Sequence, residues 1–283
     1  MTIAIALKVG DGVVLGADSA STMQAPNGIA NVYFNAEKIF NVVKGLPVGV
    51  VIAGLGGLSG RSIASLARDL RARISGSDGA WSLDPATYTI EEAAVLLRRF
   101  LYEEHYLPQF GVAAAASDRP AMSLLVAGYS ADAPMSEVFA IEVDQSGNCP
   151  PPVEVISRAI SGTAQWRGQP EAIQRLVNGF SSGVHQRLVA TGMTGAEASA
   201  LLTSALNVPL IQTGMPLQDA IDLVHYLIDV TAGFVRFAPG APTVAPPTDS
   251  AAITKHEGFR WVRRKHYFSA DLNRPIDRHA SHQ

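Results

Sequence analysis

The second residue of the chain is a threonine, and its hydroxyl is a candidate nucleophile. A threonine hydroxyl inside a chain is weakly nucleophilic, but at a freed N-terminus its own amine can act as the base. Such an amine has an ordinary pKa of about 7.7–8.0, close to the pH at which a general base works best. Removal of Met1 would free Thr2, since methionine is readily cleaved ahead of a small residue. The alternative is that Thr2 is an ordinary strand residue.

Two charged residues are candidates to assist Thr2. Apolar runs at 2–9 and 13–17, separated by Gly-Asp-Gly, predict a β-hairpin. Asp18 follows the second run, so the hairpin is expected to bring it beside Thr2. Lys38 stands mid-strand in an apolar setting, where a lysine needs an anionic partner such as Asp18. Its ammonium would keep the amine of Thr2 neutral. Each residue also has an alternative interpretation. Asp18 can be an ordinary aspartate that forms a turn, and Lys38 can be a lysine that faces solvent.

A glycine-rich stretch, AGLGGLSG at 53–60, follows an apolar run and precedes a helical pattern. Glycine lets the backbone approach a ligand closely, so the N–H of Gly54 is a candidate donor to the oxyanion of a tetrahedral intermediate. A plain tight turn is the second interpretation. The third is a phosphate-binding turn of a dinucleotide site, since the stretch nearly fits G-x-G-x-x-G/A. We rank the dinucleotide site last because antiparallel hairpins precede the stretch and no parallel units follow it.

A further hydroxyl, that of Ser161, lies in the segment RAISGT. The residues at 152–161 have strand character, and a helical pattern begins at 169. Ser161 is therefore expected to end a strand ahead of a helix. There it can serve as an active-site hydroxyl or as a helix cap, and the residue types alone favour the cap.

The elements expected around these residues occur in blocks of strands and blocks of helices. Beyond the first hairpin, strand patterns are found at 32–43, 48–54, 122–129, 136–144, 152–161 and 250–262. Helical patterns are found at 58–74, 90–107, 169–187, 195–206 and 217–236. Such segregation favours antiparallel sheets with helices packed outside them. We therefore predict one α+β domain over residues 1–263, with a helical insertion at 77–118 and a polar tail at 264–283.

Composition narrows the classes of protein to consider. The 283 residues are 47% hydrophobic and 17% charged, with a net charge of −3, so we expect a folded core and no nucleic-acid partner. Cys149 is the only cysteine, which excludes an internal disulfide and a cysteine-based zinc site and favours a reducing, cytoplasmic compartment. Charged residues interrupt the first apolar run, so no signal peptide is expected. No apolar run reaches the length of a membrane helix, so no membrane partner is expected.

Several segments together resemble proteasome-type β-subunits of the N-terminal-nucleophile (Ntn) hydrolase superfamily: TIAIALKVGDGVVLGADSAST, EKIF, GVVIAGLGG, SLLVAGY and RAISGT. The resemblance covers most of residues 2–165. It implies a four-layer αββα sandwich, with two antiparallel sheets between helix layers. It also implies hydrolysis of peptide or amide bonds through an acyl-enzyme, without a metal or an organic cofactor. Relatives assemble into rings or stacks, so the resemblance implies a homo-oligomer, and it leaves any ATP-dependent partner unknown.

The resemblance also implies a role for each residue of the site. The residues concerned are Thr2, Asp18, Lys38, Ile52, Gly54 and Ser161. The threonine would be the nucleophile and its amine the base, and the aspartate and lysine would be the charge pair that orients and tunes it. The glycine would supply the oxyanion N–H, and the serine would assist proton transfer at the amine. The isoleucine would line the pocket for the substrate side chain N-terminal to the cut, with an apolar preference.

The chain departs from the family at one element. Proteasome subunits carry an Asp-x-x-Ser-Gly-Gly stretch after the last helix, whereas the nearest segment here is PGAPTVAPPTD. Its Asp249 comes too late in the sequence to replace the missing aspartate. The departure suggests a divergent bacterial relative of the ancestral type. It also leaves alternatives open, namely a small-molecule amidase of the same superfamily, a catalytically inactive assembly subunit and a nucleotide-binding protein.

Overall fold

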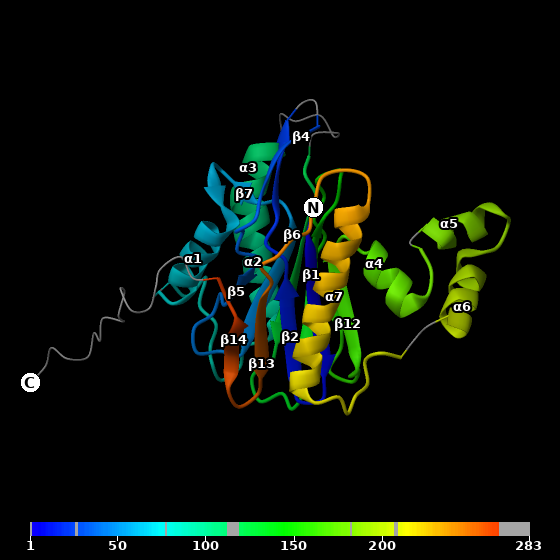
Figure 1. Ribbon diagram of the computed structural model, residues 1–283. Coiled ribbons are helices and arrows are strands. Elements are labelled where there is room, and N and C mark those ends of the chain that lie inside the picture. Colours follow the sequence, from blue (N-terminus) through cyan, green and yellow to red (C-terminus); the bar gives the residue numbers. More distant parts are fainter. Residues whose placement is uncertain are drawn as a thin grey trace, which may run out of the picture.

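The computed structural model describes residues 2–25, 28–76, 78–111, 119–181, 183–206 and 209–265. Two five-stranded antiparallel sheets form its centre (Figure 1). The first has the order β12-β1-β2-β13-β14, with β1 (Ile3–Val9), β2 (Gly12–Ala17), β12 (Thr163–Gly168), β13 (Asp249–Thr254) and β14 (Gly258–Arg263). The second has the order β11-β10-β9-β6-β5, with β5 (Ile39–Phe40), β6 (Val48–Gly54), β9 (Met122–Gly128), β10 (Glu137–Val143) and β11 (Val153–Ile156).

Two short ribbons and several helices complete the described structure. The ribbons pair β3 (Ser21–Ala25) with β4 (Gly28–Tyr33) and β7 (Gly57–Leu58) with β8 (Arg61–Ser62). The helices are α1 (Ile63–Ile74), α2 (Ile90–Arg98), α3 (Leu107–Phe110), α4 (Glu171–Ile173), α5 (Gly183–Ala190), α6 (Gly195–Leu206) and α7 (Leu217–Phe237). Two π-helical segments, η1 (Arg99–Tyr106) and η3 (Gln174–Asn178), continue α2 and α4. No helix among these residues is long and apolar enough to cross a membrane.

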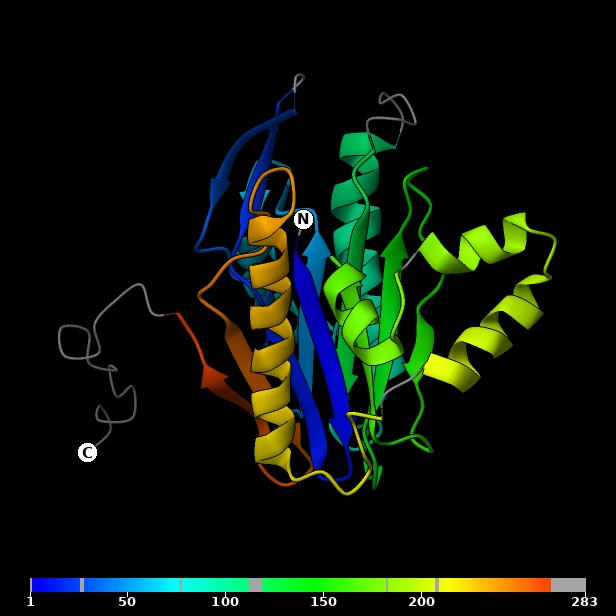
Figure 2. The same ribbon diagram turned by 45° about the vertical axis from the view of Figure 1, so that its right-hand side comes forward.

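Successive side chains of β1 point to opposite faces of the first sheet, and this alternation shows how the sheets are packed. Ile3, Ile5 and Leu7 belong to a buried cluster with α7, whereas Ala4 and Ala6 belong to the cluster between the two sheets. The outer face of the second sheet packs in turn against α1, α2 and η1. Figure 2 shows α7 lying along the strands of the first sheet, with the teal-green helix at 90–110 on the far side. Each sheet therefore contacts the other through one face and helices through the other, which agrees with the predicted α+β class.

A glycine on β2 sets how closely α7 approaches the first sheet. A Cβ added to Gly16 would lie 2.2 Å from Cγ1 of Val224. We expect Gly16→Ala to lower the free energy of unfolding by about 1–3 kcal/mol, because it overpacks this contact. Urea denaturation measures the change. Gly233→Ala is the control, because a Cβ there meets nothing within 4 Å and should stabilise α7 by up to about 1 kcal/mol. Equal effects of the two changes would contradict the close contact.

The structure corrects several element boundaries. The strand expected at 32–43 is two short strands, because β4 ends at Tyr33 and β5 begins only at Ile39. The helix expected from 58 begins at Ile63, with the hydroxyl of Ser62 capping it by accepting from the N–H of Ser65. The helix expected at 169–187 is divided, since Gly179 after η3 adopts the left-handed conformation at φ 78°. Glycine accepts that conformation without steric cost, and it ends the helical turn.

The helix expected at 90–107 is confirmed in outline. Thr89 and Glu92 form a capping box at its start, so two of the free N–H groups of the first turn are satisfied. Ile90, Ala94 and Leu97 of α2 are buried in the core cluster beside the second sheet. The insertion at 77–118 and the domain limits of 1–263 stay predictions. Of the polar tail at 264–283, residues 266–283 lie outside the described residues.

Candidate active site

Thr2 and Asp18 meet at one end of the β1–β2 hairpin. The antiparallel register pairs Ala4 with Ala17, which places the residue before β1 beside the residue after β2. The hydroxyl of Thr2 donates a hydrogen bond to Oδ1 of Asp18 at 2.9 Å. Both residues are buried, with Thr2 2% exposed and Asp18 fully enclosed. The expected contact between these two residues is confirmed.

Backbone N–H groups fix the Asp18 carboxylate in place. Its Oδ1 accepts from the N–H of Ile3 at 3.0 Å, and its Oδ2 accepts from Ala20 at 2.8 Å and from Ala245 at 3.2 Å. These donors come from three separate segments of the chain. Three hydrogen bonds from separate segments hold the carboxylate in one orientation. The Asp18 side chain is therefore held rigidly next to the Thr2 hydroxyl.

Lys38 completes a buried triad with these two residues. Its Nζ lies 2.6 Å from Oδ1 of Asp18 and also donates to the hydroxyl oxygen of Thr2. Lys38 is not mid-strand as expected, because it lies in the segment just ahead of β5. Its carbonyl accepts from the N–H of Ile52 at 3.0 Å, which ties this segment to β6. Burial lowers the pKa of Lys38, and the charge of Asp18 acts against that shift.

A cleft of about 420 Å³, open to solvent, begins at Thr2 and Lys38. Ile52 and Gly54 line it together with residues of the 20–22, 36–37 and 53–56 segments and Ile63. Gly54 ends β6 at φ 99°, and a Cβ there would lie 2.5 Å from the carbonyl oxygen of Ala121. Only glycine suits this position, for both conformation and space. The structure thus brings together five of the six residues that the sequence singles out.

The sixth residue, Ser161, lies elsewhere. The sequence suggested that it ends a strand, but β11 ends at Ile156 and β12 begins at Thr163, so Ser161 precedes a strand. In the β1–β12 register, Thr163 is opposite Lys8, and Gly168 is opposite Ile3. Ser161 is therefore near the opposite end of β1 from Thr2. Its placement at the end of a strand ahead of a helix was wrong, and Gly168 occupies that place.

Gly168 and Gln169 hold the backbone of Thr2. The N–H of Gln169 donates to the Thr2 carbonyl at 2.8 Å. Gly168 adopts φ 102°, and a Cβ there would lie 1.9 Å from the same carbonyl oxygen. Neither residue was predicted from the sequence, because β12 (TAQWRG) lacks the apolar run of a buried strand. The helical pattern that begins at residue 169 was the available signal that a strand ends just before it.

A second buried ion pair lies behind the triad. The ammonium of Lys265 forms an ion pair with Asp249, and the two side chains are 8% and 3% exposed. The same Nζ donates to the hydroxyl of Ser19 at 2.5 Å and to the carbonyl of Ala36 at 3.0 Å. These contacts join the segment after Asp18 to the segment before Lys38. Lys265 is therefore a positioning residue for both.

The β2–β13 pairing explains how Asp249 reaches the site. Asp249 is opposite Ala17 in this register, one residue before Asp18. Asp249 was expected to come too late in the chain to serve the site, yet in the fold it lies beside the triad. Lys265 carried no sequence signal, since it follows two arginines in what resembles a basic tail.

No protein-family model and no curated protein matches the chain. Within the residues that the structure covers, no three His, Cys, Asp or Glu side chains are grouped so that they could hold a metal ion.

Proposed function

We propose that the chain is a threonine-type peptidase or amide hydrolase of the N-terminal-nucleophile class. The observation that carries this proposal is the buried Thr2 hydroxyl, held between the Asp18 carboxylate and the Lys38 ammonium at the head of a cleft. A hydroxyl needs such partners to become a nucleophile, and an ordinary strand threonine does not need a buried ion pair. The costly burial of two charges beside one hydroxyl supports a catalytic role.

The proposed reaction begins once removal of Met1 frees the amine of Thr2. The Oγ1 atom attacks the substrate carbonyl carbon, and its proton passes to that amine. The N–H of Gly54, which lines the same cleft, is the proposed donor to the oxyanion. Collapse of the tetrahedral intermediate breaks the C–N bond, and the leaving amine takes the proton. Water, activated by the same amine, then hydrolyses the ester on Thr2 and restores the hydroxyl.

We propose two alternative roles for Lys38 in this reaction, as a stabilising cation or as the proton acceptor. As a cation it stabilises the negative charge that develops on Oγ1. Because burial lowers its pKa and its Nζ contacts Oγ1 directly, it is also a second candidate acceptor for the hydroxyl proton. The activity of a chain whose Thr2 amine stays blocked distinguishes the two candidate proton acceptors, the amine and Lys38. Activity in that chain assigns the proton to Lys38, and its loss assigns the proton to the amine.

The packing of the described elements supports the finer fold assignment. We propose the four-layer αββα sandwich of the Ntn class, because two antiparallel sheets face each other and helices cover their outer faces. The resemblance to proteasome β-subunits extends this proposal to a cytoplasmic, self-compartmentalising homo-oligomer, which sedimentation of the purified protein tests. Ile52 beside Thr2 supports a preference for apolar substrate side chains.

A catalytically inactive assembly subunit is the second candidate. Two observations favour it, namely the missing Asp-x-x-Ser-Gly-Gly stretch and the position of Ser161 away from Thr2. A small-molecule amidase would use the same triad, so a panel of peptides and small amides separates it from a peptidase.

Labelling with a β-lactone, an electrophile that acylates hydroxyls, tests the proposed nucleophile. We expect intact-mass and peptide analysis of the purified protein to show Thr2 as the first residue and one adduct on it. The Thr2→Ala protein should show no adduct. Retention of Met1 together with no labelling would contradict the enzyme and support the inactive subunit.

A further inference from the structure

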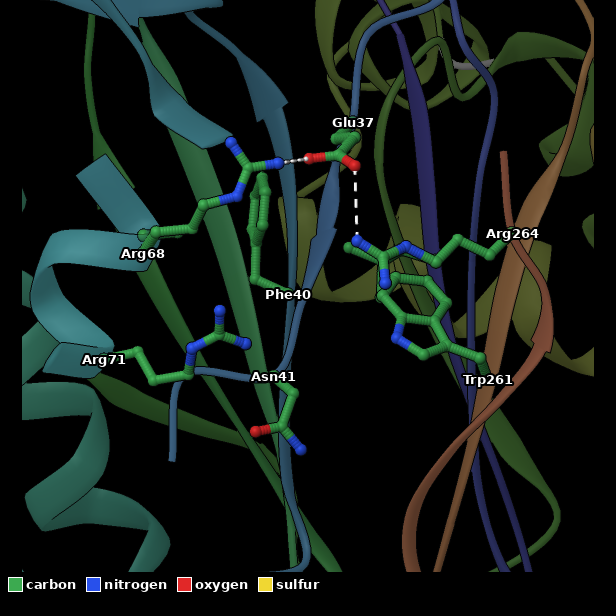
Figure 3. Close-up of a pocket in the computed structure, with 9 residues that line it drawn as sticks. Glu37, Phe40, Asn41, Arg68, Arg71, Trp261 and Arg264 are labelled. Atoms are coloured by element: carbon green, nitrogen blue, oxygen red, sulfur yellow. Dashed lines mark hydrogen bonds and ion pairs between the residues drawn. The ribbon is translucent and has the colours of Figure 1, made fainter. Parts of the chain in front are cut away.

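A second pocket, which shares Glu37 with the Thr2 cleft, lies between α1 and β14. Arg68 and Arg71 are three residues apart on α1, so their side chains share one face of the helix. Figure 3 shows both guanidinium groups pointing across the pocket, with Trp261 and Arg264 on its other side. The pocket spans about 370 Å³, part of which is open solvent, and Phe40 and Asn41 also line it.

The charges lining this pocket do not balance. Arg68, Arg71 and Arg264 contribute three positive charges, and Glu37 is the one acidic residue among the lining side chains. The Glu37 carboxylate bridges two of the arginines, at 2.7 Å to Nη2 of Arg68 and 3.4 Å to Nη2 of Arg264. Arg71 has no side-chain hydrogen bond or ion pair among the described residues. The pocket thus keeps an excess of two positive charges.

A second observation also points to a ligand from outside the chain. Oδ1 of Asn41 is buried and has no hydrogen-bond partner in the part of the chain that the structure describes. Buried polar atoms are nearly always paired, so a donor is expected there. A phosphate dianion meets this need only through a P–OH group, as in hydrogen phosphate, or through a water that it holds in the pocket. In Figure 3, Asn41 lies between Arg71 and Trp261. The unpaired Oδ1 of Asn41 and the unpaired guanidinium of Arg71 therefore line the same pocket.

We propose that this pocket binds a small phosphate-bearing dianion. Guanidinium groups bind phosphate oxygens through two parallel N–H donors, and two negative charges match the excess of the pocket. The rings of Trp261 and Phe40 provide flat walls for an organic group attached to the phosphate. Glu37 remains paired with Arg68 and Arg264 when the ligand binds. Arg71 therefore makes the principal contact with the phosphate. The proposal does not depend on the hydrolase activity.

Calorimetric titration of the full chain at constant ionic strength tests this site. The probes are inorganic phosphate, phenyl phosphate and, as the monoanion, acetate. We expect both phosphates to bind and acetate to bind at least about tenfold more weakly, because one charge is lost. Tighter binding of phenyl phosphate than of inorganic phosphate would assign the natural ligand to phosphate monoesters, and equal binding would assign it to free phosphate. Absence of phosphate binding would overturn the proposal.

Arg71→Gln and Arg73→Gln form a matched pair for the same titration. Arg73 lies on the same helix but pairs with Glu104, and it is not part of the pocket lining. We expect Arg71→Gln to weaken phosphate binding by about tenfold, because a charge-assisted hydrogen bond is lost. Arg73→Gln should change it less than about twofold, since Arg73 is paired with Glu104 and does not line the pocket. Equal weakening by both variants would overturn the site, and thermal melting confirms that each variant is folded.

Discussion

The Thr2→Ala variant is expected to lose hydrolysis of peptide and amide substrates by at least about 10³-fold in kcat/KM, because the proposed nucleophile is removed. The alanine amine and the Asp18–Lys38 pair remain, so the loss isolates the hydroxyl that donates to Asp18 at 2.9 Å. Initial rates on a peptide panel measure the effect. Thr2→Ser restores a hydroxyl at the same place and should recover part of the activity.

Ser161→Ala is the matched control for that measurement. It also removes one hydroxyl, but the β1–β12 register places Ser161 near the far end of β1. We expect its activity to stay within about twofold of the wild type, because distant sites act independently. A large loss in Ser161→Ala, or full activity in Thr2→Ala, would refute the proposed site.

Lys38→Met is expected to lower kcat by about 10²–10³-fold, because the cation beside the developing alkoxide is lost. The acidic limb of the pH–rate profile should also move to higher pH. A cation near the Thr2 amine disfavours a second positive charge, so its removal raises the pKa of the amine. Lys44→Met, at an exposed position, is the control and should change neither quantity. An unshifted acidic limb would count against the role of Lys38 in tuning the amine.

The Lys38→Met variant is also expected to change how the free energy of unfolding depends on pH. Burial lowers the pKa of Lys38 in the folded state below its ordinary 10.5. Just below pH 10.5 the unfolded chain therefore holds more protons, so the contribution of Lys38 to the free energy of unfolding rises with pH through that window. Burial also lowers the pKa of Lys8, which adds a slope of the same sign in both proteins. Urea denaturation from pH 8 upward should thus show a shallower rise in Lys38→Met than in the wild type.

Local patterns were sufficient to predict the centre of the site, whereas long-range pairing was not predictable. The hairpin of β1 and β2 is contiguous in sequence, so its turn residues and apolar runs located Asp18 beside Thr2. The break between β4 and β5 carries no proline or glycine, which is why Lys38 was assigned to a strand interior. Ser161 was misplaced because the irregular segment before β12 continues the apolar character of the preceding strand. Asp249 and Lys265 reach the site only through the β2–β13 pairing, which no local pattern encodes.

The buried Lys265–Asp249 pair has a consequence for when the protein matures. The first strand leaves the ribosome early, but the ion pair behind Asp18 and Lys38 forms only after residue 265 has been synthesised. Contacts between such distant parts of a chain form slowly, since a long loop must close first. The nascent chain therefore carries its threonine without the complete surroundings that would activate it. Under the proposed function, the chain would therefore not act on other polypeptides before residue 265 has been synthesised.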